Sequence, residues 1–163
     1  MKSNKFSIIT PTHLKNAFLD DLYDSILKQT YDRWEWVIYL NGNATRESLA
    51  KNILNDSRVV VIDGESHQGH VGGVKNAAFH AGTGDVLVEV DHDDILMPTC
   101  LEKLNEAYQD ESVGFAYSDC AVYHMTDQFH PYGSAYGWTF RTIKWNDKEL
   151  IAMDSFKPTS HSI

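Results

Sequence analysis

The fold of this chain is decided by one stretch of sequence, Val86-Leu87-Val88-Glu89-Val90-Asp91-His92-Asp93-Asp94. Its first five residues are mostly apolar and branched, as in a buried strand, and its last four form an acidic turn. Three carboxylates within four residues repel one another, so crowding them is costly unless a cation or several donors compensate the charge. Ligands of an open parallel sheet bind beyond the carboxyl ends of its strands. The stretch therefore predicts a buried strand that carries a metal-binding turn to a ligand site.

On both sides of this stretch, strand-like and helix-like patterns alternate. The patterns predict strands at residues 6–10, 34–40, 59–62, 86–90, 113–118 and 120–125, and helices at 14–29, 44–54, 71–81 and 98–108. After residue 125 the pattern becomes irregular and rich in aromatic residues and glycine. Alternation with such short links predicts an α/β fold, in which helices cover a mostly parallel sheet.

Composition limits what the chain can bind. The 163 residues are 42% hydrophobic and 23% charged, which is typical of one compact domain. A formal net charge of −9 argues against nucleic acid as a partner, because phosphate-backbone affinity requires clustered Lys and Arg. An anionic substrate would have to be bound through backbone amides and a cation. The charge balance therefore favours a metal site.

Two features predict where the domain works. Cys100 and Cys120 are too few to cross-link a fold of this size, and they read as buried free thiols in a reducing compartment, which fits the cytoplasm. No stretch approaches the roughly 18 apolar residues of a membrane span, and no signal peptide follows Met1. We expect a soluble domain without a membrane span.

The acidic turn suits a hard divalent cation. Mg²⁺ and Mn²⁺ prefer oxygen ligands and commonly take one or two protein carboxylates, leaving positions for substrate phosphates. Because residues two apart can present their side chains on the same side, Asp91 and Asp93 could share one metal, or divide metal and ribose between them. The alternative is a solvated turn in which Asp94 caps the next helix. Placement directly after an apolar strand favours the metal site.

Several segments, taken together, resemble the family-two glycosyltransferases of the GT-A fold, which are inverting enzymes that use nucleotide-diphosphate sugars. The similar segments are Phe6-Ser7-Ile8-Ile9-Thr10-Pro11-Thr12, Ile26-Leu27-Lys28-Gln29-Thr30-Tyr31, Gly73-Val74-Lys75-Asn76-Ala77-Ala78, Gly82-Thr83-Gly84-Asp85 and Val90-Asp91-His92-Asp93-Asp94-Ile95-Leu96-Met97-Pro98. The resemblance implies a Rossmann-like, three-layer GT-A fold. It also implies a nucleotide-sugar-binding core at residues 1–125 and the start of an acceptor-side region, apparently truncated, at 126–163.

The same resemblance assigns roles to individual residues. Asp93 matches the metal-binding aspartate of the family, and Asp91 matches the first aspartate of that motif, which contacts the ribose or the metal. Lys75 stands near the diphosphate, where the family usually has Arg, and it offers a point charge without bidentate contact. Asn41 stands where the family usually has an Asp that accepts a hydrogen bond from the base. The implied cofactor is Mn²⁺ or Mg²⁺.

The nucleotide loop supplies the remaining candidates. Thr10, Pro11 and Thr12 are expected to line the nucleotide, and Asn76 is a further candidate contact, although Thr10 and Asn76 could equally satisfy local backbone groups. The Asn at position 41 leaves uracil, guanine or another ring open, with uridine diphosphate favoured. The expected partners are a nucleotide-diphosphate sugar and a saccharide or other hydroxyl acceptor. Neither the sugar nor the acceptor is identified.

A catalytic base is not assigned. In the family it lies far downstream of the metal motif, and the acids available here, Asp119 and Asp154, are equally well explained as a strand-end turn and an exposed helix residue. We expect donor binding to be retained and sugar transfer to be weak or absent in this chain alone. A homo-oligomer or a partner chain could complete the acceptor side.

Two other functions remain open at this point. His67, His70, Asp91, His92 and Asp93 could be ligands of a metal-dependent phosphoester hydrolase, since imidazole and carboxylate are the usual donors there. The chain could also be a non-catalytic nucleotide-sugar-binding module, which would bind the donor without transferring or hydrolysing it.

Overall fold

The computed structural model describes residues 2–14, 18–65, 67, 70–118, 120–124, 128–132 and 140–144. Its helices and strands are β1 (Phe6–Thr12), α1 (Leu19–Leu27), β2 (Trp34–Leu40), the 3₁₀ turn η1 (Arg46–Ser48), α2 (Lys51–Asn55), β3 (Val59–Asp63), α3 (Val71–His80), β4 (Val86–Glu89), α4 (Cys100–Ala107), β5 (Val113–Ser118), β6 (Cys120–His124), β7 (Gln128–Tyr132) and β8 (Phe140–Lys144). Strands and helices alternate as far as β5.

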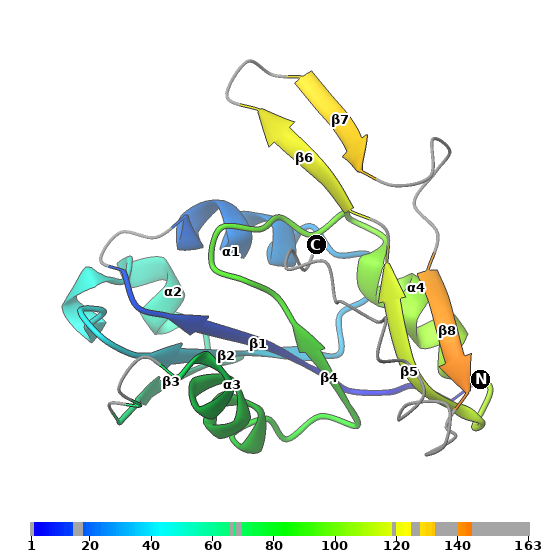
Figure 1. Cartoon of the computed structure of the whole chain (residues 1–163), viewed down its shortest axis with the longest axis horizontal. Coiled ribbons are helices and arrows are strands. Elements are labelled where there is room, and N and C mark those ends of the chain that lie inside the picture. Colours follow the sequence, from blue (N-terminus) through cyan, green and yellow to red (C-terminus); the bar gives the residue numbers. More distant parts are fainter. Residues whose placement is uncertain are drawn as a thin grey trace.

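The centre of the fold is a four-stranded sheet in the order β3-β2-β1-β4 (Figure 1). All three pairings are parallel. The chain builds outward from β1 through β2 to β3, then returns to place β4 on the other side of β1. The strand order thus reverses between β1 and β4, which is where doubly wound sheets bind their ligands.

Helices cover both faces of this sheet, as the sequence predicts. On one face, Leu22 of α1, Ile53 of α2 and Leu101 of α4 share a buried cluster with alternate residues of the strands. On the other face, Val74 and Ala78 of α3 pack in a second cluster. The α/β, three-layer arrangement with a mostly parallel sheet is therefore confirmed.

The strands after α4 leave this sheet. β5 pairs with β8, and β6 pairs with β7, in two separate antiparallel pairs. The predicted strands at 113–118 and 120–125 correspond to β5 and β6. β7 and β8 were not predicted, because no period-2 pattern marks the aromatic, glycine-rich segment in which they lie. No helix among the described residues has the length and apolar character needed to cross a lipid bilayer.

All four expected helices are shorter than predicted, and two of them differ most. The helix expected at 14–29 is α1, which begins only at Leu19, because Leu14 and Phe18 are 46% and 65% exposed and do not extend its buried face. The helix expected at 44–54 is interrupted: η1 ends in the extended Leu49 and Ala50, and α2 follows with Ile53 as its buried residue. Four-residue spacing of apolar residues overestimated the first of these helices.

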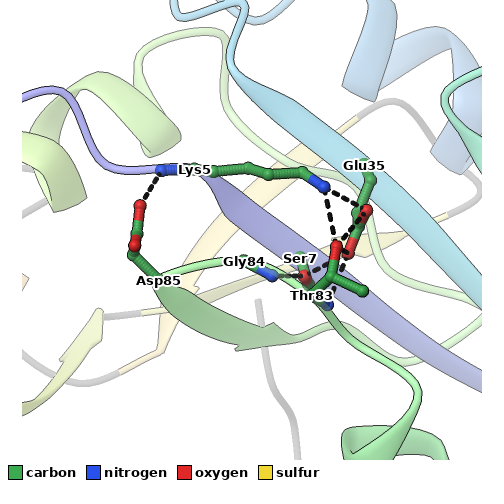
Figure 2. A network of polar contacts seen from close by, with 6 residues as sticks. All are labelled: Lys5, Ser7, Glu35, Thr83, Gly84 and Asp85. Carbon is green, nitrogen blue, oxygen red and sulfur yellow. Dashed lines mark hydrogen bonds and ion pairs between the residues drawn. The ribbon is translucent and has the colours of Figure 1, made fainter.

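A buried carboxylate fastens the amino-terminal edge of the sheet (Figure 2). Glu35, at the start of β2, accepts hydrogen bonds from the Ser7 hydroxyl of β1 at 2.6 Å and from the Thr83 amide at 2.7 Å. Its other carboxylate oxygen pairs with the Lys5 ammonium. The Ser7 hydroxyl in turn accepts a hydrogen bond from the Gly84 amide at 2.7 Å. One side chain thus joins β1, β2 and the loop that leads into β4.

The same contacts set the charge state of Glu35. Burial by itself would raise the pKa of this carboxyl, but the hydrogen bonds from Lys5, Ser7 and Thr83 outweigh it and lower the pKa from 4.5 to about 2. A carboxyl whose pKa is lowered on folding stabilises the protein above its unfolded pKa. That stability is lost as the pH falls toward the folded value.

Replacing Glu35 by Gln should weaken the sheet and flatten its acid response. We expect Glu35→Gln to lower the free energy of unfolding at pH 7 by about 2 kcal/mol, because buried donors lose a charged acceptor. Between pH 4.5 and about 2, the wild type should lose more stability than the variant does. Denaturant unfolding at a series of pH values measures both quantities. Glu111→Gln, at an exposed position, is the control; an equal pH slope in Glu35→Gln and wild type would contradict the account.

Candidate functional site

The acidic turn lies where β4 ends. The Val90 amide donates to the Ile9 carbonyl at 3.1 Å, which carries the pairing with β1 one residue past β4. The Asp94 amide then donates to the Asp91 carbonyl at 3.1 Å and closes the turn. Asp93 is exposed, and the side chain of Asp91 is 32% exposed. Both carboxylates can therefore be reached from solvent at the carboxyl edge of the sheet.

Lys75 joins this turn from α3. Its ammonium contacts Glu89 and lies 3.4 Å from an Asp91 carboxylate oxygen. Strand alternation explains the meeting: Val88 and Val90 pack on the α1 side of the sheet, so Glu89 and Asp91 fall on the α3 side. Burial alone would lower the pKa of Lys75, but the hydrogen bond to Glu89 and the charge of Asp91 raise it. The ammonium is therefore charged at neutral pH.

Asp94 has a different environment. Burial, followed by the charges of Asp91 and Asp93, raises the pKa of Asp94 to about 7. It does not cap the next helix, because the N-cap of α4 is Thr99. Its Oδ2 is buried and, among the described residues, has no hydrogen-bond partner; the hydroxyl of Thr12, which is 1% exposed, is in the same condition. Unsatisfied oxygens at this edge fit a site that a bound group or water completes.

The three residues of the expected nucleotide loop, Thr10, Pro11 and Thr12, have different environments. Thr10 is fully buried, and its hydroxyl accepts a hydrogen bond from the Trp36 indole at 2.9 Å. By strand alternation, Thr12 follows Thr10 on the α1 face, whereas Pro11 falls on the α3 face with Lys75. The sequence grouped all three as nucleotide contacts. In the structure the Thr10 side chain is buried and hydrogen-bonded to Trp36, so we expect Thr10 to support the loop rather than to contact a ligand.

Asn41 and the loop after β1 are held together. The backbone N–H of Asn41 donates to the Thr12 carbonyl at 2.8 Å, and the backbone N–H of Asn43 donates to the His13 carbonyl at 3.2 Å. Gly42 between them has a φ of +59°, and a side chain there would also meet His13 at 3.3 Å. The ring of His13 in turn packs edge-on against that of His92, with 5.4 Å between centroids. Loops from β1, β2 and β4 thus meet at one edge.

Asn76 is not drawn into this arrangement by any contact that the structure describes. It is exposed on α3, and its carbonyl lies 2.7 Å from Nδ1 of His80, one turn further along the same helix. Neighbouring residues on a helix point in different directions, so the position of Lys75 does not carry Asn76 to the acidic turn with it. Its role as a nucleotide contact stays a prediction.

The histidines do not gather around the acidic turn. His67 lies 3.1 Å from the Tyr39 hydroxyl, His70 is exposed at the N-cap of α3, and His92 packs against His13. Within the part of the chain that the structure describes, no group of three or more His, Cys, Asp or Glu side chains is placed to hold a metal ion by itself. The hydrolase alternative, which needs such a cluster, gains no support.

Sequence reasoning missed two residues of this region. Glu89 carries the visible signal of a charge inside an apolar strand, but its partner on α3 could not be read from the sequence. Tyr39 carries no such signal. Its ring lies so close to Gly64 that a Cβ there would overlap it, and its hydroxyl accepts a hydrogen bond from the Glu65 backbone amide at 3.3 Å. Tyr39 therefore anchors the segment that leads from β3 toward α3.

Comparison with known proteins now identifies the family. The family model described as glycosyl transferase family 2 matches residues 7–162. This chain belongs to glycosyltransferase family 2. The resemblance seen in the sequence motifs is thereby confirmed.

Curated relatives of this family 2 domain are longer proteins. "Glycosyltransferase GlyG" of Streptococcus pneumoniae is 26% identical over 130 residues, which are 77% of this chain and 42% of the relative. The Escherichia coli protein named UDP-Glc:alpha-D-GlcNAc-diphosphoundecaprenol beta-1,3-glucosyltransferase WfgD is 26% identical over 116 residues, which are 71% of this chain and 46% of the relative. The chain thus spans less than half the length of these two relatives.

Solved structures share the fold. TarS of S. aureus (residues 1–349, in complex with UDP) has a TM-score of 0.56 and 25% identity, over 66% of this chain and 32% of that one. The mannosyltransferase PcManGT of Pyrobaculum calidifontis, in complex with GDP-Man and Mn²⁺, has a TM-score of 0.60 over 74% of this chain and 36% of that one. At 20% identity, the second likeness bears on the fold alone. The GT-A fold expected for this family 2 domain is confirmed.

The close approach of Gly64 to Tyr39 can be tested with a pair of alanine substitutions. A Cβ at Gly64 would lie 2.2 Å from Cε1 of Tyr39 and 2.4 Å from the Leu40 carbonyl oxygen. We expect Gly64→Ala to lower the free energy of unfolding by about 2 kcal/mol, because the backbone must shift to relieve the overlap.

Gly72 is the matched control, since a Cβ there meets nothing within 4 Å and the residue lies in α3. Gly72→Ala should leave stability unchanged or raise it by up to about 1 kcal/mol through helix propensity. Denaturant unfolding measures the change in the free energy of unfolding for both variants. Equal changes would contradict the close packing of Tyr39 against Gly64.

Proposed function

We propose that this chain is the donor-binding part of a metal-dependent glycosyltransferase that transfers a sugar from a nucleotide-diphosphate sugar to an acceptor hydroxyl. The observation that carries the proposal is the meeting of Lys75 with Asp91, in the turn that also carries the exposed Asp93, at the edge where the loops after β1 and β2 are joined. That edge lies at the strand-order reversal, the usual ligand crevice of such a sheet. Membership of glycosyltransferase family 2 supports the reaction class.

Asp91 and Asp93 would hold the divalent ion, Mn²⁺ or Mg²⁺. They are oxygen donors reachable from solvent, and two carboxylates leave coordination positions for phosphate oxygens. Thr12 and Asp94 have buried oxygens at the same edge that find no hydrogen-bond partner within the described part of the chain, which agrees with a site that a bound group completes. When bound, the ion would offset negative charge that develops on the departing diphosphate.

Lys75 would place a second positive charge beside the diphosphate. A chain with a formal net charge of −9 repels an anionic donor at long range, so local cations are required where the phosphates bind. The pKa of Lys75 is raised by Glu89 and Asp91 despite its burial, so the ammonium keeps its charge. A lysine acts as a point charge and would not grip the phosphate in the bidentate manner of arginine.

Pro11, Thr12 and Asn41 would bind the nucleoside, with Thr10 supporting the loop from the core. The loop of Asn41 is tied to the backbone of Thr12 and His13, so it is ordered before a ligand arrives. The side-chain amide of Asn41 can both donate and accept hydrogen bonds, so it could pair with uracil or with guanine. We favour uridine diphosphate because TarS, which is 25% identical to this chain, was solved in complex with UDP.

The acceptor side stays a proposal in its entirety. We propose residues 1–125 as the donor-binding core and 126–163 as the start of the acceptor region, with a saccharide or other hydroxyl acceptor as in the name of WfgD. The two acids considered as catalytic base, Asp119 and Asp154, lie outside the described residues. A cytoplasmic location and assembly with a second copy or another chain likewise remain predictions.

The donor site can be tested by calorimetry. We expect the chain to bind uridine diphosphate more tightly than guanosine diphosphate, and to do so only with Mn²⁺ or Mg²⁺ present. Asp91→Asn and Asp93→Asn should each weaken that binding by about tenfold or more, because a carboxylate ligand to the ion is lost. Asp32→Asn, an exposed acid before β2 and far along the sheet from the site, should leave binding unchanged.

Each contrary result has a distinct meaning. Binding that is equally tight without a divalent ion would remove the metal from the account. Tighter binding of guanosine diphosphate than of uridine diphosphate would change only the proposed identity of the nucleotide base. Donor binding without transfer, even to a range of saccharide acceptors and with a partner chain added, would favour the non-catalytic module.

A further inference from the structure

Glu89 is the charged residue that the proposed function leaves unused. It ends β4, whose other residues are Val86, Leu87 and Val88, and it stands opposite Ile9 of β1 in the register. A carboxylate among apolar strand residues costs free energy unless it is paired. Its side chain is 35% exposed, so the charge is only partly solvated. A partner that compensates this cost is therefore to be expected.

That partner is Lys75, which divides its contacts unequally. Its ammonium is in close contact with Glu89, whereas the oxygen of Asp91 lies at 3.4 Å, a long distance for a charged hydrogen bond. The side chains of Lys75 and Asp91 are 30% and 32% exposed, so all three charges interact through a partly desolvated region. Glu89 is thus the principal partner of the ammonium, and Asp91 is the secondary one.

The unequal sharing matters because Asp91 is also the proposed metal ligand. An ammonium in full contact with Asp91 would occupy the oxygens that a divalent ion needs, and would repel that ion at short range. Lysine has a long, flexible stem, so its position depends on what holds its end. Of the partners that the structure describes for Lys75, Asp91 would be the one left if the charge of Glu89 were removed.

We propose that Glu89 is a positioning residue that holds the Lys75 ammonium away from Asp91. Asp91 is thereby kept for the divalent ion, and Lys75 is kept at the mouth of the site for the diphosphate. This inference rests on the proposed function, since it assumes a cation at Asp91 and Asp93. It goes beyond that function because it gives Glu89, the charged residue of β4, a role: Glu89 acts by positioning Lys75 and does not contact the ligand.

A simpler account is that Glu89 only adds negative charge near the metal. Both accounts predict that Glu89→Gln weakens Mn²⁺ binding. They differ in what happens when Lys75 is absent, because added charge acts without Lys75 and positioning does not. A double-mutant cycle with Lys75→Met separates them.

The experiment measures Mn²⁺ binding by electron paramagnetic resonance of the free ion, with and without uridine diphosphate. The proteins are wild type, Glu89→Gln, Lys75→Met and the double variant, each checked for unchanged unfolding. With Lys75 in place, Glu89→Gln should weaken Mn²⁺ binding about fivefold, and in the Lys75→Met background by less than about twofold. Lys75→Met alone should tighten binding of Mn²⁺ without nucleotide, since a competing cation is gone. Glu65→Gln, which removes an exposed carboxylate just after β3, should change neither background.

The inference would be overturned by an equal loss in both backgrounds, by a larger loss without Lys75, or by no loss at all. These outcomes leave the proposed function standing, provided that wild type binds Mn²⁺ with uridine diphosphate and that Asp91→Asn or Asp93→Asn weakens this binding by about tenfold or more. If wild type shows no such binding, the proposed function fails and the role of Glu89 fails with it.

Discussion

Everything at the site depends on the parallel pairing of β1 with β2 on one side and with β4 on the other. The registers bring Thr12 beside Leu40 and Ile9 beside Glu89, so the residues that follow these strands emerge at a common edge. Chain direction alone therefore gathers Asn41 from β2 and Asp91 from β4 around the end of β1. At the opposite edge, the carboxylate of Glu35 joins the beginnings of the same three strands, as Figure 2 shows. The sheet is thus held at one end and left open for a ligand at the other.

The charges at the carboxyl edge of the sheet are the physical reason for proposing a cation there. Among the described residues, the Lys75 ammonium contacts Glu89 and Asp91, and two further carboxylates, Asp93 and Asp94, follow in the same turn. Burial, and after it the charges of Asp91 and Asp93, raises the pKa of Asp94 to about 7, so the negative charges at this edge add to the cost of ionising that carboxyl. A diphosphate approaching such an edge would be repelled. A divalent ion reverses the balance, because it is attracted by the carboxylates and then attracts the phosphates.

The sequence foretold the parts of this account that depend on local periodicity. Apolar runs marked the four strands of the sheet and placed Asp91 and Asp93 directly after one of them. That these two carboxylates bind a ligand stays a prediction. Contacts between segments that are far apart in the chain could not be predicted from the sequence. The burial of Thr10 depends on the indole of Trp36, and the pairing of Glu89 with Lys75 depends on how α3 lies across the sheet. Neither relation leaves a periodic trace. The start of α1 was misplaced for a related reason, since apolar spacing continues through Leu14 and Phe18 although both side chains are exposed.

The most direct test of the central claim is the location of the ion and nucleotide in crystals grown with Mn²⁺ and uridine diphosphate. The account predicts an anomalous difference peak for Mn²⁺ between the carboxylates of Asp91 and Asp93, touched by diphosphate oxygens, with the uridine against Pro11, Thr12 and Asn41. A manganese peak or a nucleotide bound anywhere other than this edge of the sheet would contradict it.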